Sequence, residues 1–329
     1  TCDADLQTDP KNCGRCGRDC LGAACAAGRC EAVVLAAGLG NPTGLTLDGP
    51  DVYVTAQRDG TVLKVPKAGG APKVLASGQE DVHGVVVDGT TLYWSNGDFR
   101  FNDAGAVGGI WTCTLPDCAA PLSNGFLYYA ARNDSEVRRV TPSGASDILV
   151  AATNSPFDIA VDGTHVYYTS NQPSLYRALI DGGSVPNEEA VGPLDSKLIG
   201  YVTVDDQRYY WAYVDQADKG HVLSGSKAQP AAPKTSYGSE ADNVGAIGVA
   251  VDATYLYWST DGTAAGNVPD ANGKLFACPK QGCGPQGPIL LADQLVFGGP
   301  IATDDQAVYW VEFGSLGQAN GRLRKVAKP

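Results

Sequence analysis

A short motif recurs seven times along the chain and constrains the fold more than any other feature. It consists of an aliphatic residue, a Tyr, usually a second aromatic residue and then usually a small residue, as in Leu92-Tyr93-Trp94-Ser95. The seven copies lie at residues 52–55, 92–95, 127–130, 166–169, 209–212, 256–259 and 308–311. Repeats with a period of tens of residues are typical of solenoids, propellers and arrays.

An Asp stands five residues before the repeated Tyr in six of the copies, and the third copy has Ser123 there. The six are Asp48, Asp88, Asp162, Asp205, Asp252 and Asp304. An Asp in a tight turn accepts hydrogen bonds from backbone N–H groups two residues on. A catalytic array is the alternative, but turn chemistry explains both the residue type and the spacing. We therefore interpret these residues as turn formers.

Each full copy carries four short strand signals. In the first copy they are residues 44–47, 52–55, 61–65 and 71–75, the first two joined by the tight-turn signal Asp48-Gly49. No stretch shows a convincing helical period. Four antiparallel strands repeated radially form the blades of a β-propeller. The sequence therefore predicts an all-β fold, a seven-bladed β-propeller.

The two ends of the repeat region complement each other. Residues 323–328 form a third strand with no fourth after it, and residues 31–36 form a fourth strand with no third before it. Pairing them in the last blade hides both edges and closes the ring. We expect residues 31–36 and 323–326 to lie side by side, with the preceding segment outside the ring.

The third copy is incomplete. Only residues 119–122 separate Cys118 from Ser123. Four extended residues span at most about 14 Å, which is too short for the two strands found here in the other copies. Either the third blade lacks its inner strand or a segment has been lost from the chain. The second interpretation is favoured because an open inner wall exposes strand edges.

Residues 1–30 are predicted to form a cysteine-rich head, and residues 31–329 the propeller. The cysteines of the head are Cys2, Cys13, Cys16, Cys20, Cys25 and Cys30. The head has almost no large apolar side chain, so cross-links must hold it together and few contacts with the ring are expected. Cys13-x-x-Cys16 with Cys20 also fits a zinc or iron–sulfur site. Three disulfides of open connectivity are favoured.

The other four cysteines form two pairs with the same spacing, Cys113 with Cys118 and Cys278 with Cys283. Both pairs fall on the turn after a third strand, where they flank a hairpin at a distance that suits a disulfide. A redox-active site is the weaker interpretation, because the spacing is not Cys-x-x-Cys and no cation is fixed beside both pairs.

Charge and cysteine usage bound the partners and the compartment. The formal net charge is −12, which gives no electrostatic reason to bind nucleic acid or an anionic membrane. No apolar run approaches the roughly 18–20 residues of a transmembrane segment. Ten Cys, no Met and a start at Thr1 favour a secreted protein, extracellular or at the cell surface.

The Leu-Tyr-Trp-Ser copies at residues 92–95 and 256–259 and the Tyr-Tyr-Thr copy at 167–169 resemble the repeats of YWTD-type and NHL-type propellers. The resemblance extends over residues 31–329. Residues 12–17, Asn-Cys-Gly-Arg-Cys-Gly, are similar to the Cys-rich leaders of secreted bacterial propellers. YWTD propellers usually have six blades, whereas this chain has seven copies. The resemblance implies a recognition surface more often than an enzyme.

In a propeller, the loops from the fourth strand to the next first strand and from the second strand to the third share one face around the central channel. This face, the mouth, is predicted to be rich in acidic and amide groups. The expected ligand-binding residues are Arg58, His83, Asn96, Asp98, Arg100, Asn133 and Asn171. Further polar residues expected there are Asn41, Asp59, Asp81, Asp134, Asn154, Asp158, Asp242 and Asn243. Simple turn formation by Asp and Asn is the alternative explanation.

Carboxylate and amide oxygens are the ligands that calcium prefers, and propeller lactonases of the gluconolactonase kind hold such an ion on the channel axis. Calcium is therefore the metal to expect if there is one, and no other cofactor is predicted. The candidate ligands are Asp98, Asp215, Asp261 and Glu312.

His83 is the candidate catalytic residue. It precedes an inner strand and is expected near the channel mouth, where a His can act as a general base, as in some propeller lyases. His165 and His221 fall in a hairpin turn and at the start of a third strand, so no second His supports it.

Two classes of function remain open. The leading hypothesis is a secreted recognition or assembly module that binds a glycan, a peptide or a neighbouring subunit, with the head as a spacer or docking piece that permits self-assembly. The alternative is a calcium-assisted lactonase or a His-dependent lyase at the channel mouth. An enzyme requires several oxygens that converge on one point, or His83 within hydrogen-bond reach of a second polar group.

Overall fold

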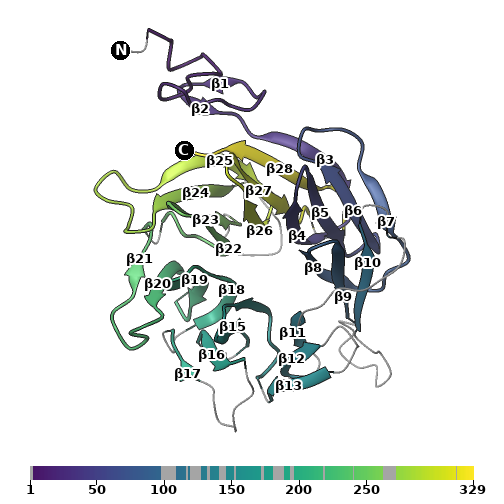
Figure 1. Ribbon diagram of the computed structural model, residues 1–329. Helices are drawn as coiled ribbons and strands as arrows, with labels where there is room; N and C mark the ends of the chain where they lie inside the picture. The colour runs from purple at the N-terminus through teal and green to yellow at the C-terminus, as the bar shows by residue number, and fades with distance from the viewer. Residues whose placement is uncertain are drawn as a thin grey trace.

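The strands form seven sheets arranged around a central axis, with a small two-stranded sheet outside the ring (Figure 1). The computed structural model describes residues 3–97, 109–115, 118, 127–131, 134–140, 146–151, 153–171, 174–180, 189–192, 196–217, 219–239, 241–261, 272–315 and 317–329. The prediction of an all-β, seven-bladed β-propeller is confirmed.

Blades 1 to 3 contain the following strands. Blade 1 has β4 (Pro42–Asp48), β5 (Asp51–Ala56), β6 (Thr61–Pro66) and β7 (Lys73–Ala76). Blade 2 has β8 (Val82–Asp88), β9 (Thr91–Asn96) and β10 (Gly109–Thr114). Blade 3 has β11 (Leu127–Ala131), β12 (Glu136–Val140) and β13 (Ser146–Val150).

Blades 4 to 7 each have four strands. Blade 4 has β14 (Asp158–Val161), β15 (His165–Thr169), β16 (Tyr176–Leu179) and β17 (Glu189–Ala190). Blade 5 has β18 (Ser196–Val204), β19 (Arg208–Asp215), β20 (Gly220–Ser226) and β21 (Thr235–Ser236). Blade 6 has β22 (Ala246–Val251), β23 (Tyr255–Thr260), β24 (Gly273–Pro279) and β25 (Ile289–Leu295). Blade 7 has β26 (Gly298–Thr303), β27 (Ala307–Glu312), β28 (Gly321–Ala327) and β3 (Val33–Leu39).

The ring closes in blade 7, as predicted. Strand β3 pairs antiparallel with β28, with Ala36 opposite Leu323 and Val34 opposite Arg324. The first strand after the head therefore supplies the outer strand of the last blade. Both edges that the sequence left unpaired are covered in one sheet.

Blades 2 and 3 each show three strands among the described residues. In blade 2 the order is β8–β9–β10, and in blade 3 the described sheet begins with β11, which carries the repeat motif of a second strand. The prediction of a lost segment falls on residues 119–122, which lie outside the described residues.

The aromatic repeat forms the packing between blades. Tyr257, Trp258, Trp211 and Trp310 have no exposed surface. Each second strand has a neighbouring blade on both sides, so both faces of the strand are apolar rather than one. The Trp258 ring packs against Phe276, with 5.4 Å between ring centroids.

The repeated Asp has two roles, one for each carboxylate oxygen. In blade 6, Asp252 Oδ1 accepts the backbone N–H of Thr254 and of Tyr255, at 2.7 Å each. This is the predicted turn chemistry. Asp252 Oδ2 accepts the hydroxyl of Tyr257 at 2.8 Å and pairs with Lys328 of blade 7 at 2.6 Å. The fixed spacing between Asp and Tyr is therefore also a side-chain contact.

The ion pair between a repeated Asp and a Lys of the next blade, which we call the clasp, recurs around the ring. The Lys always follows the third strand. The described residues contain four clasps, namely Asp162–Lys227 at 2.6 Å, Asp205–Lys280 at 2.7 Å, Asp252–Lys328 at 2.6 Å and Asp304–Lys67 at 2.9 Å. Burial acts to raise the pKa of Asp205, but hydrogen bonds from Lys280, the backbone and Tyr210 outweigh it and lower the pKa.

We expect each clasp to stabilise the ring measurably. The variants Lys280→Met and Asp205→Asn and their combination form a double-mutant cycle. Because both groups are partly buried, the coupling free energy should be about 1–2 kcal/mol, above the value for exposed ion pairs. Urea unfolding of the four proteins measures it. A coupling energy near zero would show that the clasp geometry adds nothing to the Asp turn.

The head is held by disulfides. Cys13 pairs with Cys25 and Cys20 with Cys30, and Cys16 is also disulfide-bonded, whereas Cys2 lies outside the described residues. Strands β1 (Cys25–Ala26) and β2 (Arg29–Cys30) form its sheet. The predicted disulfides Cys113–Cys118 and Cys278–Cys283 are present.

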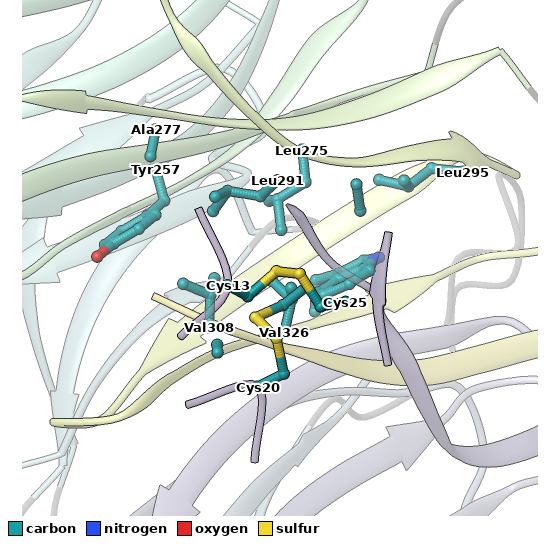
Figure 2. Packing of buried hydrophobic residues seen from close by; sticks show 14 residues of the cluster. Cys13, Cys20, Cys25, Tyr257, Leu275, Ala277, Leu291, Leu295, Val308 and Val326 are labelled. Atoms are coloured by element: carbon teal, nitrogen blue, oxygen red, sulfur yellow. A yellow bond between two sulfur atoms is a disulfide. The ribbon is translucent and has the colours of Figure 1, made fainter. Parts of the chain in front are cut away.

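The expectation of few contacts between head and ring is wrong. The cysteines at positions 13, 20, 25 and 30 are at most 8% exposed and belong to one apolar cluster with side chains of blades 6 and 7. Figure 2 shows the sulfurs of Cys13, Cys20 and Cys25 beside Val308 and Val326. Disulfide sulfur is itself apolar, so a head whose large aliphatic residues are only Leu6 and Leu21 still buries apolar surface.

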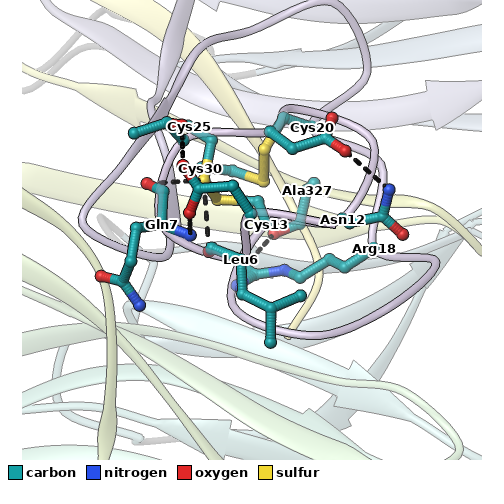
Figure 3. Close-up of a disulfide and its surroundings, with 12 residues drawn as sticks. Leu6, Gln7, Asn12, Cys13, Arg18, Cys20, Cys25, Cys30 and Ala327 are labelled. Atoms are coloured by element: carbon teal, nitrogen blue, oxygen red, sulfur yellow. Dashed lines mark hydrogen bonds between the residues drawn. A yellow bond between two sulfur atoms is a disulfide. The ribbon is translucent and has the colours of Figure 1, made fainter. Parts of the chain in front are cut away.

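Arg18 of the head joins the ring through the backbone of the last strand. Its Nε donates to the carbonyl of Lys328 at 2.8 Å and its Nη2 to the carbonyl of Ala327 at 3.3 Å, beneath the two disulfides (Figure 3). The carbonyl of Lys67 receives a bond at 2.7 Å from Lys325, and the carbonyl of Lys227 receives one at 3.2 Å from Arg177. In each case the accepting carbonyl belongs to a clasp Lys.

Register explains why the head is needed at blade 6. Lys325 and Arg177 each lie opposite the repeated Tyr of their own blade, whereas the residue opposite Tyr257 in blade 6 is Ala277. Ala277 has no donor and belongs to the apolar cluster that contains the disulfides. The head therefore supplies from outside the donor that blade 6 lacks.

Candidate functional site

The channel contains a cavity of about 370 Å³, lined by the inner strands β4, β8, β14, β18, β22 and β26. Most of its lining is aliphatic or small. Neighbouring inner strands lie so close together that some positions require glycine. A Cβ at Gly44 would collide with the carbonyl oxygen of His83 in the next blade, and a Cβ at Gly248 would collide with that of Gly299.

Four polar side chains of blades 1 and 2 join at the mouth beside this cavity, and we call them the mouth network. Asn41 donates to Gln57, and Gln57 donates to Asp81. His83 Nε2 lies 3.0 Å from Gln57 Nε2 and 3.2 Å from Asp81 Oδ1. With Nε2 protonated the ring donates to Asp81, and with Nε2 unprotonated it accepts from Gln57. His83 therefore has the second polar group that a catalytic role requires.

Backbone conformation explains several of the polar residues at the mouth. Asn41, Asp81 and Asn154 all have positive φ, at 51°, 50° and 53°. In each case the carbonyl accepts the N–H of the residue four positions after the repeated Tyr, as from Gln57 to Asn41 at 3.0 Å. Asn and Asp tolerate this left-handed conformation better than other side chains. The interpretation of these residues as turn formers therefore accounts for their positions.

The other predicted ligand-binding residues are dispersed. Arg58 is exposed, and its backbone N–H is bonded to Gly40 O. The Asn96 amide contacts the amide of Gln79, and Asn171 is exposed in another blade. Asp98, Arg100 and Asn133 lie outside the described residues. The structure thus brings His83 together with Asn41, Gln57 and Asp81 rather than with Arg58 or Asn171.

The described candidates for calcium ligands do not form one site. Glu312 is 1% exposed and accepts from Arg324 Nη1 at 2.8 Å and from Trp310 Nε1 at 3.3 Å. Asp215 is bonded to His221 Nε2 at 3.0 Å and to the backbone of its own loop. Asp261 packs against Gly245 of its own blade. Asp98 lies outside the described residues.

Among the described residues, one group of His, Cys, Asp or Glu side chains is compact enough to hold a metal ion, namely Cys13, Cys20 and Cys30. Their sulfurs are in disulfides. The geometry therefore favours the disulfide interpretation of the head over a zinc or iron–sulfur site.

A second cavity, of about 650 Å³, opens on the opposite face between blades 4 and 5. Its Lys and Arg are already paired, Lys227 with Asp162 at 2.6 Å and Arg177 with Glu189 at 2.7 Å, and Asp205 pairs with Lys280. Burial, and then Arg177, lower the pKa of His165 at its edge. Members of the clasps line this cavity and account for its charged groups, so the charge is not evidence of a ligand site.

Asp158 stands at the start of β14 and lines the channel cavity. Its Oδ2 accepts the N–H of Val202 in blade 5 at 2.8 Å. Burial raises its pKa to about 7, although hydrogen bonds from the backbone of Val202 and Ile159 oppose the shift. It is the one carboxylate among the described residues that line the channel.

The pKa of Asp158 predicts a pH-dependent effect of Asp158→Asn. The unfolded chain ionises this group near 3.9, so the wild-type protein loses stability through Asp158 as the pH rises from about 4 to 7. Asn carries no such cost. The free energy of unfolding of Asp158→Asn, relative to that of the wild type, should therefore increase by about 1–2 kcal/mol between pH 5 and pH 8. This value is reduced to allow for access of water to the carboxylate through the channel. Urea unfolding at both pH values measures the gain, and a difference independent of pH contradicts it.

Sequence reasoning missed Gln57, which joins the two blades of the mouth network. The available signal was its register, since Gln57, Asn171 and Asp261 each lie four residues after the repeated Tyr. Gln79 was missed as well, although it accepts from Trp94 Nε1 at 2.8 Å. Neither residue belongs to a motif with a fixed chemistry.

Comparison with known proteins adds the fold alone. No protein-family model matches the chain, and no curated protein matches it. The solved structure of the computationally designed Ika8 protein is similar with a TM-score of 0.54 and 11% sequence identity, over 90% of this chain and 98% of that one. A nidogen/laminin complex structure matches 72% of this chain and 75% of that one, at 16% identity and a TM-score of 0.43, which is too low to support an argument. Within the described residues, no helix is long and apolar enough to cross a membrane.

Proposed function

We propose that this protein is a secreted recognition module that binds a glycan at the mouth, through the mouth network of Asn41, Gln57, Asp81 and His83. The observation that carries the proposal is the interlocking of these four side chains across two blades, beside the channel cavity. Amide, carboxylate and imidazole groups held in one network present donors and acceptors close together. Vicinal hydroxyls of a sugar need this combination.

Secretion is supported by the four disulfides among the described residues. Such cross-links persist in oxidising compartments and are rare in the cytosol. The excess of acidic residues gives no basis for binding nucleic acid.

The test is a glycan array probed with the full chain, followed by calorimetric titration of the best ligand. His83→Ala and Gln57→Ala should weaken binding at least tenfold with little change in melting temperature. Gln306→Ala is the matched control, because Gln306 is exposed in a turn on the opposite face. Loss of binding in the control, or equal affinity in all variants, places the site elsewhere. A peptide library screened in parallel would reveal a peptide ligand instead.

The contact between His83 and Asp81 supports one second candidate, a His-dependent lyase. A carboxylate beside an imidazole is a common arrangement for a general base. Incubation with polysaccharides that contain uronic acids, followed by the ultraviolet absorbance of the unsaturated product, tests this activity. Turnover that His83→Ala abolishes in a folded protein would replace the binding function by an enzymatic one.

A further inference from the structure

Asp158 differs from the other acidic residues that join neighbouring blades. Each clasp Asp has a Lys within 2.9 Å. No Lys, Arg or His within the described residues forms an ion pair with Asp158. A carboxylate that is partly withdrawn from water without a cation beside it is costly.

The cavity that Asp158 lines matches this unpaired charge. Among the described residues that line it from β4, β8, β14, β18, β22 and β26, Asp158 is the only charged residue and Tyr201 the only other titratable one. The volume of about 370 Å³ can hold a small molecule. A carboxylate accepts about four hydrogen bonds, so the backbone bonds leave it capacity for a further donor.

We propose that the channel binds a primary ammonium group on an aliphatic chain, with Asp158 as its counter-ion. The aliphatic walls contact the chain, and the carboxylate accepts the ammonium. The acidic excess of the protein, with a net charge of −12, favours the approach of a cation. This site is distinct from the mouth network and does not depend on glycan binding there.

The same chemistry is offered by a free alkylamine and by a Lys side chain of a partner protein. n-Pentylamine and 1-pentanol form a matched pair of probes that differ in the charged group. A short peptide with a central Lys is the third probe, and potassium and calcium chloride are the fourth and fifth.

Calorimetric titration of the intact chain tests the proposal. Pentylamine should bind at least tenfold more tightly than pentanol, and Asp158→Asn should remove this difference. Asp206→Asn, an exposed Asp on the opposite face, and His83→Ala should leave it unchanged. Binding of the Lys peptide identifies a protein partner, and binding of pentylamine alone identifies a free amine; both support the site.

The pH dependence provides a measurement on the unmodified protein. Burial holds the pKa of Asp158 at about 7, and Tyr201 stays neutral because burial, and then Asp158, raise its pKa. Pentylamine should therefore bind about tenfold more weakly at pH 6 than at pH 8, since only the ionised carboxylate pairs with it. Equal affinity for amine and alcohol, affinity that is independent of pH, or preference for calcium would overturn the proposal.

Discussion

Deletion of residues 1–30 should lower the melting temperature of the ring by roughly 6 °C, which corresponds to a loss of about 4 kcal/mol for a ring of this size. The deletion exposes apolar side chains such as Leu291, Val308 and Val326, which pack against the disulfides. It also leaves the carbonyl of Lys328 without its donor Arg18. Differential scanning calorimetry of the full chain and of the truncated ring measures the effect.

A rescue variant separates the two causes. In the truncated ring, Ala277→Arg places a donor opposite Tyr257, the position that Arg177 and Lys325 occupy in their own blades. It should recover about 1 kcal/mol through the bond to the carbonyl of Lys328. Ala277→Leu is the control, with added bulk and no donor. A melting temperature of the truncated ring within a degree or two of the full chain would show that the head does not stabilise the ring.

Trp258→Ala should cost roughly 3–5 kcal/mol of unfolding free energy. The side chain is fully buried between blades 5 and 6, where it packs on Phe276. Its Nε1 has no hydrogen-bond partner within the described part of the chain, so the loss is one of packing. Trp258→Phe should therefore cost about a third as much.

Chemical denaturation of both Trp258 variants and of His83→Ala compares the loss of stability at a buried packing residue with that at a residue of the mouth network. His83 is partly exposed at the mouth, and its replacement should change stability by less than about 1 kcal/mol. A His83→Ala protein as unstable as Trp258→Ala would make His83 a structural residue and remove the main support for the mouth network as a binding site.

The architecture could be predicted because its signals are local and repeated. The Asp of the turn and the Tyr of the second strand lie five residues apart in one hairpin, and their contact follows from that distance alone. The closure of blade 7 could also be predicted, since residues 31–36 and 323–326 each lacked a partner.

The clasps and the docking of the head could not be predicted, because each depends on two segments from different blades. Lys280 contacts Asp205, 75 residues away in the chain, and only the register of the finished ring brings them together. The small size of Ala277 carried no information until its neighbours were known. For the same reason His83 was identified by type, but its partner Gln57 was not.

Blades 5, 6 and 7 each carry both members of a clasp and therefore have a direction. In each of them the Asp faces one neighbour and the Lys the other, as blade 6 shows with Asp252 toward blade 7 and Lys280 toward blade 5. Contacts of this kind are heterologous, and they produce a closed ring only when the rotation per unit matches the number of units. The same two flanks can therefore extend an open series of blades. Fragments that end between blades should consequently associate head to tail rather than face to face, and exchange of blades between chains is the misassembly that this design permits.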